Sequence, residues 1–554
     1  MEFNLAQVFS AVAAANPQRD CVVFGHQRFT FAQTDERARR FARALNSWGL
    51  GAHRERSELA PYESGQSHLG LYMANCNEFL EAMLGAYHAR VAPFNVNYRY
   101  VADELVYLLG NASADAVMYH ARFAPTLAEA LEKGGLPPPR LIHVDDGSGN
   151  APLPGAVRYE ELLAFNAGEV SDDALDITPS PDDLYVLYTG GTTGMPKAVL
   201  WRQHDIYVNA MGGRSYGTGE VVSGLDEIVE RSRVAAPGSM TCAPLMHGAA
   251  QWAAFINLCG GRPFVMASTT THFDPAEAWA LASRERVASL SIVGDAFGRP
   301  LVDELESGDY DLSGLTVLVT GGAALSAPLK QRFVELLPQL TILDAGGSSE
   351  SGSQMGQVSS RGHRASGRFA PNPGAVVVSE DIIRILSPGD DEIGWLAQQG
   401  PIPLGYLGDP DKTARTFPVI EGIRHSVPGD RARWAANGEI ELLGRDAVTI
   451  NSGGEKIFAE EVEAAIAEHP AVYDVVVTGR PSARWGNEVV AIVQLAVGER
   501  ASRAELAEGI LAEAARHLAR YKLPKEIVFR DRLQRSPSGK ADYRWAKDQV
   551  TQSV

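Results

Sequence analysis

The chain has 554 residues, 45% of them hydrophobic and 21% charged, which is an ordinary composition for a globular protein with a sizeable core. Its formal net charge is −18, which argues against nucleic acid and anionic membranes as bulk partners, because both would repel the chain, although local basic sites could still bind phosphates. A prior of roughly 150 residues per domain suggests about four units, although large α/β enzymes often merge several of them.

The first twenty residues, MEFNLAQVFSAVAAANPQRD, predict an amphipathic helix and not a signal peptide, since they include Glu2 and no basic region. No apolar run reaches the ~18 residues of a membrane span. The cysteines show no CxxC spacing, which favours reduced thiols in a cytoplasmic protein, with Cys242 and Cys259 in the core. The four cysteines are Cys21, Cys76, Cys242 and Cys259.

A glycine-rich stretch, YTGGTTGMPK at 188–197, follows the apolar run Leu184–Leu187, which reads as a strand. Glycines let backbone N–H groups approach an anion closely, and Lys197 adds a compact positive charge. The pattern GxxxxGK[ST] does not fit, because Met195 and Pro196 intervene and Ala198 follows the lysine. The stretch predicts a polyphosphate-binding loop; taken alone, a flexible surface turn stays open as the alternative.

Short β-branched runs then alternate with helical patterns. Leu315–Thr320 predicts a buried strand, and Ser326 is a plausible N-cap for a helix with Pro328 in its first turn. Thr341–Asp344 predicts the next strand. This alternation is typical of parallel βαβ units.

The pattern changes near Gly444–Asp446. The last stretch, about 110 residues, reads as a compact α+β unit of normal domain size. We therefore predict a large domain over 1–443 and a small one over 444–554. The expected helices of the small domain are Glu460–Glu468 and Glu505–Arg520, and the expected strands are Val472–Val477, Val489–Val497 and Glu526–Phe529.

The stretch 188–197 resembles the phosphate loop of the adenylate-forming superfamily, whose members include acyl-CoA synthetases, luciferases and peptide-synthetase adenylation domains. The usual form is YTSGTTGxPKG; this chain departs at Gly190 and Ala198, both small, so we expect the loop to persist. The resemblance implies a catalytic role for Thr193. It implies nucleotide binding by Thr189, Gly190, Gly191, Thr192, Gly194 and Lys197.

Further motifs of this superfamily follow in order. APLMHG at 243–248 is similar to the segment in which a histidine or an aromatic residue gates the acyl site, with His247 as the candidate catalytic residue. Read alone, His247 would be a satisfied core histidine. GGAALS at 321–326 resembles the strand-to-helix turn beside adenine, which implies contacts from Gly322 and Ala323.

GGSSE at 346–350 stands where the family has YGxTE. The resemblance implies that Ser349 donates to a phosphate, with Gly347 and Ser348 beside it, and that Glu350 helps to hold Mg²⁺. Gly346 replaces the family's tyrosine, which leaves open how that face of adenine is covered. A solvated loop acid is the alternative for Glu350 taken alone.

Two motifs lie near the predicted boundary. PGD at 428–430 resembles the TGD motif, in which the Asp430 carboxylate would accept both ribose hydroxyls. GRDAVTINSGGEKI at 444–457 resembles the hinge, with Arg445 as a ribose contact and Ala447 in place of the usual Asp or Lys. Its Gly453, Gly454 and Lys456 would face the cofactor, although a hairpin is also compatible.

RSPSGKADYR at 535–544 resembles the terminal signature of the superfamily and makes Lys540 the catalytic lysine. A lysine in such a polar stretch is ordinarily only a solvated charge. Because Lys540 stands at the end of this ordered series of motifs, we interpret it as catalytic instead. The resemblance covers nearly the whole chain. Several details look closest to bacterial acyl-CoA ligases that activate fatty acids and sterol side-chain acids.

The resemblance implies a large multi-sheet α/β domain with a small mobile α+β domain, and a reaction that uses ATP, Mg²⁺ and coenzyme A. A carboxylic acid would form acyl-AMP and then the CoA thioester. Loading of a carrier protein, oxidation of the adenylate and non-catalytic nucleotide binding remain alternatives, and a homodimer is expected only from base rates. Expected acyl-pocket residues are Met246, Ala249, Ala250, Trp252, Phe255, Ala296 and Phe297. The small residues Gly248–Ala250 indicate either room for a bulky tail or close helix packing.

Overall fold

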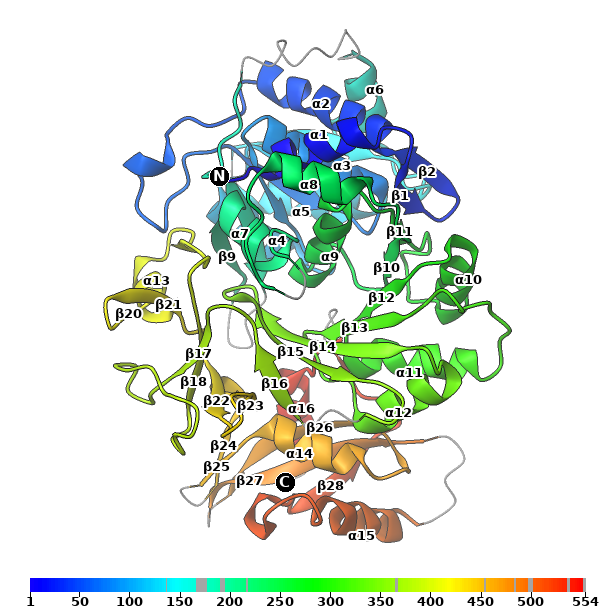
Figure 1. Ribbon diagram of the computed structural model, residues 1–554, viewed down its shortest axis with the longest axis vertical. Helices are drawn as coiled ribbons and strands as arrows, with labels where there is room; N and C mark the ends of the chain where they lie inside the picture. The colour runs from blue at the N-terminus through cyan, green and yellow to red at the C-terminus, as the bar shows by residue number, and fades with distance from the viewer. Residues whose placement is uncertain are drawn as a thin grey trace.

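The computed structural model describes residues 1–135, 137–165, 177–189, 195–215, 218–363, 367–452, 455–482, 485–496, 502–535 and 539–551. It has a large α/β body, drawn in blue to yellow in Figure 1, and a small α+β body, drawn in orange and red below it. The predicted fold class is therefore confirmed.

The first sheet of the large body has the strand order β19-β9-β8-β4-β3-β5-β6-β7. Strands β3 to β8 run parallel, and β9 and β19 add antiparallel edges. Its strands are β3 (His68–Tyr72), β4 (Ala92–Asn95), β5 (Ala116–His120), β6 (Arg140–Val144), β7 (Val157–Arg158), β8 (Leu184–Thr189), β9 (Lys197–Arg202) and β19 (Gly405–Tyr406).

Nine helices of the described chain pack in this region. They are α1 (Leu5–Ala15), α2 (Phe31–Ser47), α3 (Asn77–His88), α4 (Ala102–Ala112), α5 (Ala124–Gly134), α6 (Tyr159–Phe165), α7 (Gln203–Ala210), α8 (Leu225–Arg233) and α9 (Gly248–Cys259). Every residue of β3, β4 and β5 is buried, as expected for parallel strands covered on both faces. The helix predicted at the N-terminus is confirmed as α1.

The second sheet follows the order β2-β1-β11-β10-β12-β13-β14-β15-β16-β23-β22-β18-β21-β20, with β17 beside β18. Its strands are β1 (Asp20–Phe24), β2 (Gln27–Thr30), β10 (Ser239–Thr241), β11 (Phe264–Met266), β12 (Ser289–Ile292), β13 (Val317–Gly321), β14 (Thr341–Ser348), β15 (Gly352–Ser359), β16 (Arg368–Pro371), β17 (Ala375–Val378), β18 (Gly394–Gln399), β20 (Val419–Ile420), β21 (Ile423–Ser426), β22 (Asp430–Trp434) and β23 (Ile440–Arg445). The accompanying helices are α10 (Pro275–Glu285), α11 (Gly294–Leu305), α12 (Ala327–Leu336) and α13 (Pro410–Thr416).

The small body is a separate sheet ordered β25-β24-β27-β26, with β28 beside β27. It comprises β24 (Ile450–Ser452), β25 (Glu455–Ile457), β26 (Val472–Ser482), β27 (Gly486–Leu495), β28 (Glu526–Phe529), α14 (Ala459–Ala467), α15 (Arg503–Ala514) and α16 (Tyr543–Thr551). The strand β23 ends at Arg445 and β24 opens the separate sheet at Ile450. The domain boundary at 444 itself stays a prediction.

The predicted elements are found with shifted ends. The strand predicted at 315–320 is β13, and the helix after Ser326 is α12, where Ser326 is the N-cap residue but its side chain makes no capping hydrogen bond. The strand predicted at 341–344 continues to Ser348 as β14. The helix predicted over 505–520 was too long, because the backbone turns after Ala514 with bonds from Arg516 N to Glu513 O and from His517 N to Ala514 O.

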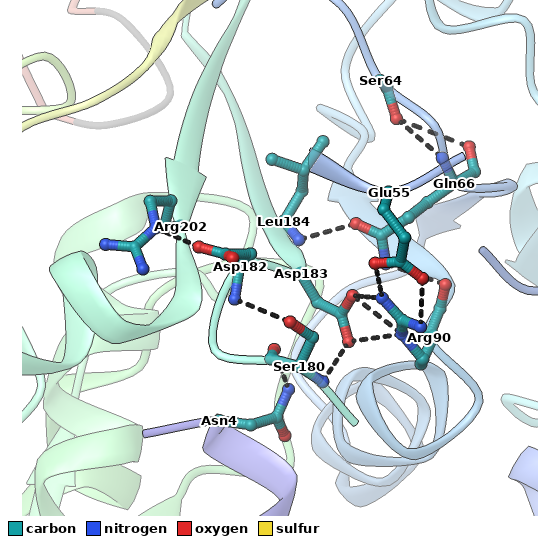
Figure 2. Close-up of polar contacts among 10 residues, drawn as sticks. All are labelled: Asn4, Glu55, Ser64, Gln66, Arg90, Ser180, Asp182, Asp183, Leu184 and Arg202. Atoms are coloured by element: carbon teal, nitrogen blue, oxygen red, sulfur yellow. Dashed lines mark hydrogen bonds and ion pairs between the residues drawn. The ribbon is translucent and has the colours of Figure 1, made fainter. Parts of the chain in front are cut away.

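A partly buried ion-pair network lies at the amino-terminal end of β8 (Figure 2). Arg90 Nε donates to Asp183 Oδ1 at 3.0 Å, and Arg90 Nη1 donates to Glu55 Oε1 at 2.9 Å. Leu184 N donates to Gln66 Oε1 at 2.7 Å. Because Asp183 is only 2% exposed, these contacts anchor β8 before it runs toward Thr189 at its other end.

The small body rests on α11 of the large body. The Arg299 guanidinium lies over the Tyr473 ring at 4.5 Å from the centroid. A Cβ atom at Gly539 would lie 3.2 Å from Ala296 Cβ, so the turn before Lys540 packs closely against the helix. None of the helices in the described part of the chain combines the length and apolar character needed to cross a lipid bilayer. All four cysteines are free thiols, and Cys259 is buried whereas Cys242 is only partly so.

Candidate active site

The strands β8 and β9, which flank the glycine-rich stretch, pair antiparallel. Thr189 and Lys197 are paired across the two strands, which places a hydroxyl and an ammonium group at the base of the loop. Lys197 Nζ lies 3.5 Å from Asp409 Oδ2. The predicted loop residues Gly190, Gly191, Thr192, Thr193 and Gly194 lie outside the described residues, so their roles remain predictions.

Asn95, at the end of β4, joins the phosphate-loop strand to the acyl-site segment. Its Nδ2 donates to Tyr188 O at 2.9 Å and to Met246 O at 2.7 Å, and its Oδ1 accepts from Tyr188 N at 2.8 Å. Asn95 is 4% exposed. Because the carboxyl ends of the parallel strands β3, β4 and β8 meet at one edge, this edge is where α/β sheets bind ligands.

His247 is the N-cap residue of α9, immediately after the segment held by Asn95. Its buried Nε2 atom has no hydrogen-bond partner among the residues that the structure describes, so it is not a satisfied core histidine. Burial, together with the positive charges of Lys540 and Arg99, lowers the pKa of His247 to about 4. The imidazole is therefore neutral at pH 7.

Gly322 and Ala323 follow β13 and face the lysine of the small body. Gly322 has φ of +79°, and a Cβ atom there would lie 3.6 Å from Lys540 Cε. Ala323 packs against Gly294, at the start of α11. The turn that was predicted to lie beside adenine is therefore next to the Lys540 side chain.

The segment with Gly347, Ser348, Ser349 and Glu350 forms the tight turn between β14 and β15. A Cβ atom at Gly347 would lie 2.0 Å from Gly352 O, so only glycine fits there. Tyr406 OH donates to Glu350 Oε1 at 2.9 Å, and Ser426 Oγ donates to Glu350 O at 2.6 Å. The acid is held in a defined position and is not a freely solvated loop residue.

Met355 fills the space beside Gly346, where the family's tyrosine would project. A Cβ atom at Gly346 would lie 2.8 Å from both Met355 Cε and Cγ. A larger residue at 346 would therefore require Met355 to move.

Asp430 and Arg445 are cross-strand partners on β22 and β23, and Arg445 Nε donates to Asp430 Oδ1 at 3.0 Å. The Asp430 charge raises the pKa of Arg445. Burial and the Arg445 charge lower the pKa of Lys540, whereas Glu350 and Asp430 oppose that shift. The structure thus brings Glu350, Asp430 and Arg445 together with Lys540, which comes from the other body.

The remaining predicted residues of the small body lie outside this cluster or outside the described residues. Gly453 and Gly454 are not described, and the backbone of Lys456 pairs with Asn451 in the β24–β25 hairpin. Across the described ranges there is no group of three or more His, Cys, Asp or Glu side chains that could hold a metal ion by themselves. A metal here would have to take most of its ligands from substrate and water.

The acyl-pocket residues separate into packed and accessible positions. A Cβ atom at Gly248 would lie 2.7 Å from Leu187 Cδ2, so this glycine serves close packing of α9 on β8. Ala250 and Phe255 are buried, whereas Ala249 is exposed and Trp252 is half-buried. The small residues therefore do not by themselves indicate a wide pocket.

Several residues at the site were not found from the sequence. Gln251 Nε2 donates to Leu245 O at 2.7 Å, and Leu245 N donates to Asn75 Oδ1 at 2.7 Å, so amide side chains clamp the acyl-site segment. Tyr406 and Lys412 lie beside Glu350 and Lys197. The asparagine and glutamine residues belong to no sequence motif with a characteristic spacing. Their proximity to the site therefore becomes visible only in the structure.

The fold is that of two-domain adenylate-forming enzymes. The structure superposes on the crystal structure of the anthranilate CoA ligase AuaEII in complex with anthranoyl-AMP with a TM-score of 0.80. The match covers 100% of this chain and 98% of that chain at 18% identity, so it supports the fold alone.

Residues 9–406 match the AMP-binding enzyme family, and residues 461–540 match the AMP-binding enzyme C-terminal domain. The chain belongs to the AMP-binding enzyme family. It is 54% identical over 551 residues to the medium-chain acyl-CoA ligase Mig of Mycobacterium avium, covering 99% of this chain and 98% of the relative. It is 38% identical over 553 residues to a medium/long-chain-fatty-acid–CoA/3-oxocholest-4-en-26-oate–CoA ligase of Mycobacterium marinum, covering 99% and 96%.

The lowered pKa of His247 predicts a pH-dependent stability. The unfolded imidazole titrates near 6.5 and the folded one near 4, so protonation favours the unfolded chain, and stability falls as pH drops from 6.5 toward 4. Between pH 7.5 and pH 5 the contribution is about 2 kcal/mol. Urea unfolding of His247→Gln should show a pH dependence smaller than wild type by that amount. Equal dependence in both proteins would contradict a neutral buried His247.

Proposed function

We propose that this protein is an ATP-dependent acyl-CoA ligase that activates a medium- or long-chain fatty acid, or a sterol side-chain acid, through acyl-AMP. The observation that carries the proposal is that Lys540 of the small body lies against the Gly322 turn of the large body, where its charge interacts with those of Glu350, Asp430 and Arg445. The substrate class comes from the relatives, whose names specify medium-chain, long-chain and 3-oxocholest-4-en-26-oate ligases.

In the first step, a carboxylate oxygen of the acid attacks the α-phosphorus of ATP, and the bond to the bridging oxygen breaks so that pyrophosphate leaves. Two anions must approach each other, so alignment and charge stabilisation dominate the catalysis. Asp430 accepts from the ribose hydroxyls, Arg445 holds that carboxylate, and Lys540 offsets charge on the α-phosphate. The loop from Thr189 to Lys197 contacts the outer phosphates.

In the second step, the CoA thiol loses its proton and its sulfur attacks the acyl carbon, so that AMP leaves with the electron pair of the acyl–oxygen bond. The family resemblance implies that the small body first swings about residues 445–447 and presents the segment with Gly453, Gly454 and Lys456. A short 3₁₀ turn, Asp446–Val448, lies at this point and separates β23 from β24. We place the domain boundary at 444, next to this turn, because the sheet of the large body ends there and the separate sheet of the small body follows.

The site residues fit a bound Mg²⁺. Mg²⁺ takes oxygen ligands, usually one or two carboxylates with water and phosphate oxygens, and Glu350 offers such a carboxylate beside the proposed phosphates. When bound, the cation would neutralise charge on the outer phosphates. We propose that the enzyme requires Mg²⁺. We also propose that the protein is cytoplasmic and forms a homodimer.

A pyrophosphate-release screen tests the proposal. Wild-type protein is mixed with ATP, Mg²⁺ and CoA, and with short, medium, long-chain or sterol-derived acids in turn. We expect acid-dependent pyrophosphate release in the medium, long-chain or sterol arms, with one AMP and one CoA thioester formed per pyrophosphate. ATP binding without acid-dependent release in any arm would contradict the proposal.

The acceptor in the second step has one alternative, a carrier protein. The relatives named as CoA ligases favour CoA. Turnover of acyl-AMP to AMP with a carrier bearing a phosphopantetheine thiol, but not with CoA, would assign the alternative.

A further inference from the structure

Two lysines from separate segments lie against one tyrosine ring beside the phosphate loop. Lys412 Nζ lies 4.7 Å from the centroid of the Tyr406 ring, and Lys197 Nζ lies 5.9 Å from it. Lys197 begins β9 and Lys412 lies on α13, so the tertiary structure alone brings them together. Lys412 belongs to none of the motifs described above.

Strand pairing places this lysine pair at the base of the loop. Tyr406 on β19 pairs with Val199 on β9, two residues from Lys197, and Lys197 pairs with Thr189. The hydroxyl of the same tyrosine donates to Glu350, the proposed magnesium ligand. Tyr406 thus contacts both lysines through its ring and Glu350 through its hydroxyl.

The carboxylates near the pair are already engaged. Asp409 Oδ2 lies 3.5 Å from Lys197 Nζ, and Asp409 Oδ1 accepts from the backbone N of Lys412 at 2.9 Å. Glu350 Oε1 accepts from Tyr406. Within the described ranges no carboxylate lies at ion-pair distance from Lys412 Nζ.

The neighbouring charges also act on Lys412. Burial and the Lys197 ammonium group lower the pKa of Lys412, and Glu350 and Asp409 only partly offset this. Two adjacent ammonium groups repel each other, and an anion with several oxygens placed between them relieves that repulsion. The arrangement is suited to a polyphosphate and offers no advantage to a neutral ligand.

We propose that Lys412 acts together with Lys197 to bind the outer phosphates of ATP and the pyrophosphate that leaves. This inference rests on the proposed function and extends it to a residue outside the recognised motifs. Lys412 is a binding residue for the leaving group, in contrast to Lys540, which lies over Gly322 beside Asp430 and Arg445.

Calorimetric titration with inorganic pyrophosphate and Mg²⁺ tests the inference without any acid or turnover. The Lys412→Gln variant loses one charge-assisted contact, so its dissociation constant for pyrophosphate should be about 10- to 100-fold higher than that of wild type. Lys412→Arg keeps the charge and should recover most of the affinity. The matched control is Lys133→Gln, because Lys133 is an exposed lysine on α5 that pairs with Asp103 and Glu129.

Steady-state kinetics then distinguish the phosphates of ATP from those of CoA. We expect Lys412→Gln to raise KM for ATP and leave KM for CoA unchanged, with a thermal unfolding midpoint equal to that of wild type. Pyrophosphate binding by Lys412→Gln equal to that of wild type, or a rise in KM for CoA alone, would overturn the inference. Wild-type protein that binds pyrophosphate but activates no acid would refute the proposed function and leave the role of Lys412 supported.

Discussion

Lys540→Ala should reduce acyl-adenylate formation by at least about 10²–10³-fold, the usual effect of removing one donor that stabilises transition-state charge. The Lys540 side chain lies against Gly322, and its charge interacts with those of Glu350 and Asp430. Thioester formation from supplied acyl-AMP should be largely spared, because that step uses another face of the small body. Single-turnover assays of each half-reaction measure the two effects separately.

The matched control for this variant is Lys547→Ala. Lys547 is an exposed lysine on α16 of the same small body, seven positions along the chain. It should keep both half-reactions at the wild-type rate. Equal losses of adenylation and thioester formation in Lys540→Ala would contradict a role confined to the first step.

Glu350→Gln should have the second largest effect, a loss of about 10²–10³-fold in adenylation with a higher requirement for Mg²⁺. Glutamine keeps an oxygen for the Tyr406 hydroxyl but removes the negative charge. The Glu350 charge raises the pKa of Lys540, so the alkaline limb of the pH–rate profile should move to lower pH in the variant. Rates of acyl-AMP formation across pH and Mg²⁺ concentration check both expectations.

Tyr406→Phe provides the comparison for Glu350. It removes the hydrogen bond to Glu350 Oε1 and retains both the carboxylate and the aromatic ring under the two lysines. We expect a smaller loss than in Glu350→Gln and no change in the Mg²⁺ requirement. An unchanged alkaline limb in Glu350→Gln would show that the acid does not act on Lys540.

The helices, strands and site residues could be predicted where the sequence shows a clear apolar periodicity or a series of ordered motifs. Short β-branched runs predicted the strands β13 and β28, although both strands are only partly buried. The apolar face predicted for the helix at 460–468 is confirmed, because Val462, Ala465 and Ile466 are buried in α14. The motif order predicted that Asp430, Arg445 and Lys540 belong to one site although more than a hundred residues separate the first from the last. Such order carries information that no single motif holds.

Other features depend on contacts between distant segments, which local sequence does not encode. The end of α15 is set by turn hydrogen bonds after Ala514, whereas the apolar spacing continues to Leu518, which is also buried. Asn95 looks like an ordinary polar residue until its hydrogen bonds to Tyr188 and Met246 are seen. Gly248 could indicate space or packing, and only the position of Leu187 shows that it serves packing.

The proposed reaction begins with attack of the acid on the α-phosphorus of ATP, and an isotope experiment tests this step directly. The acid is labelled with ¹⁸O in both carboxylate oxygens and is converted to its CoA thioester by wild-type protein. Because the attacking oxygen stays on phosphorus when AMP leaves, each AMP should carry one ¹⁸O atom and the pyrophosphate none. Label recovered in inorganic phosphate, or AMP without label, would contradict the acyl-adenylate route.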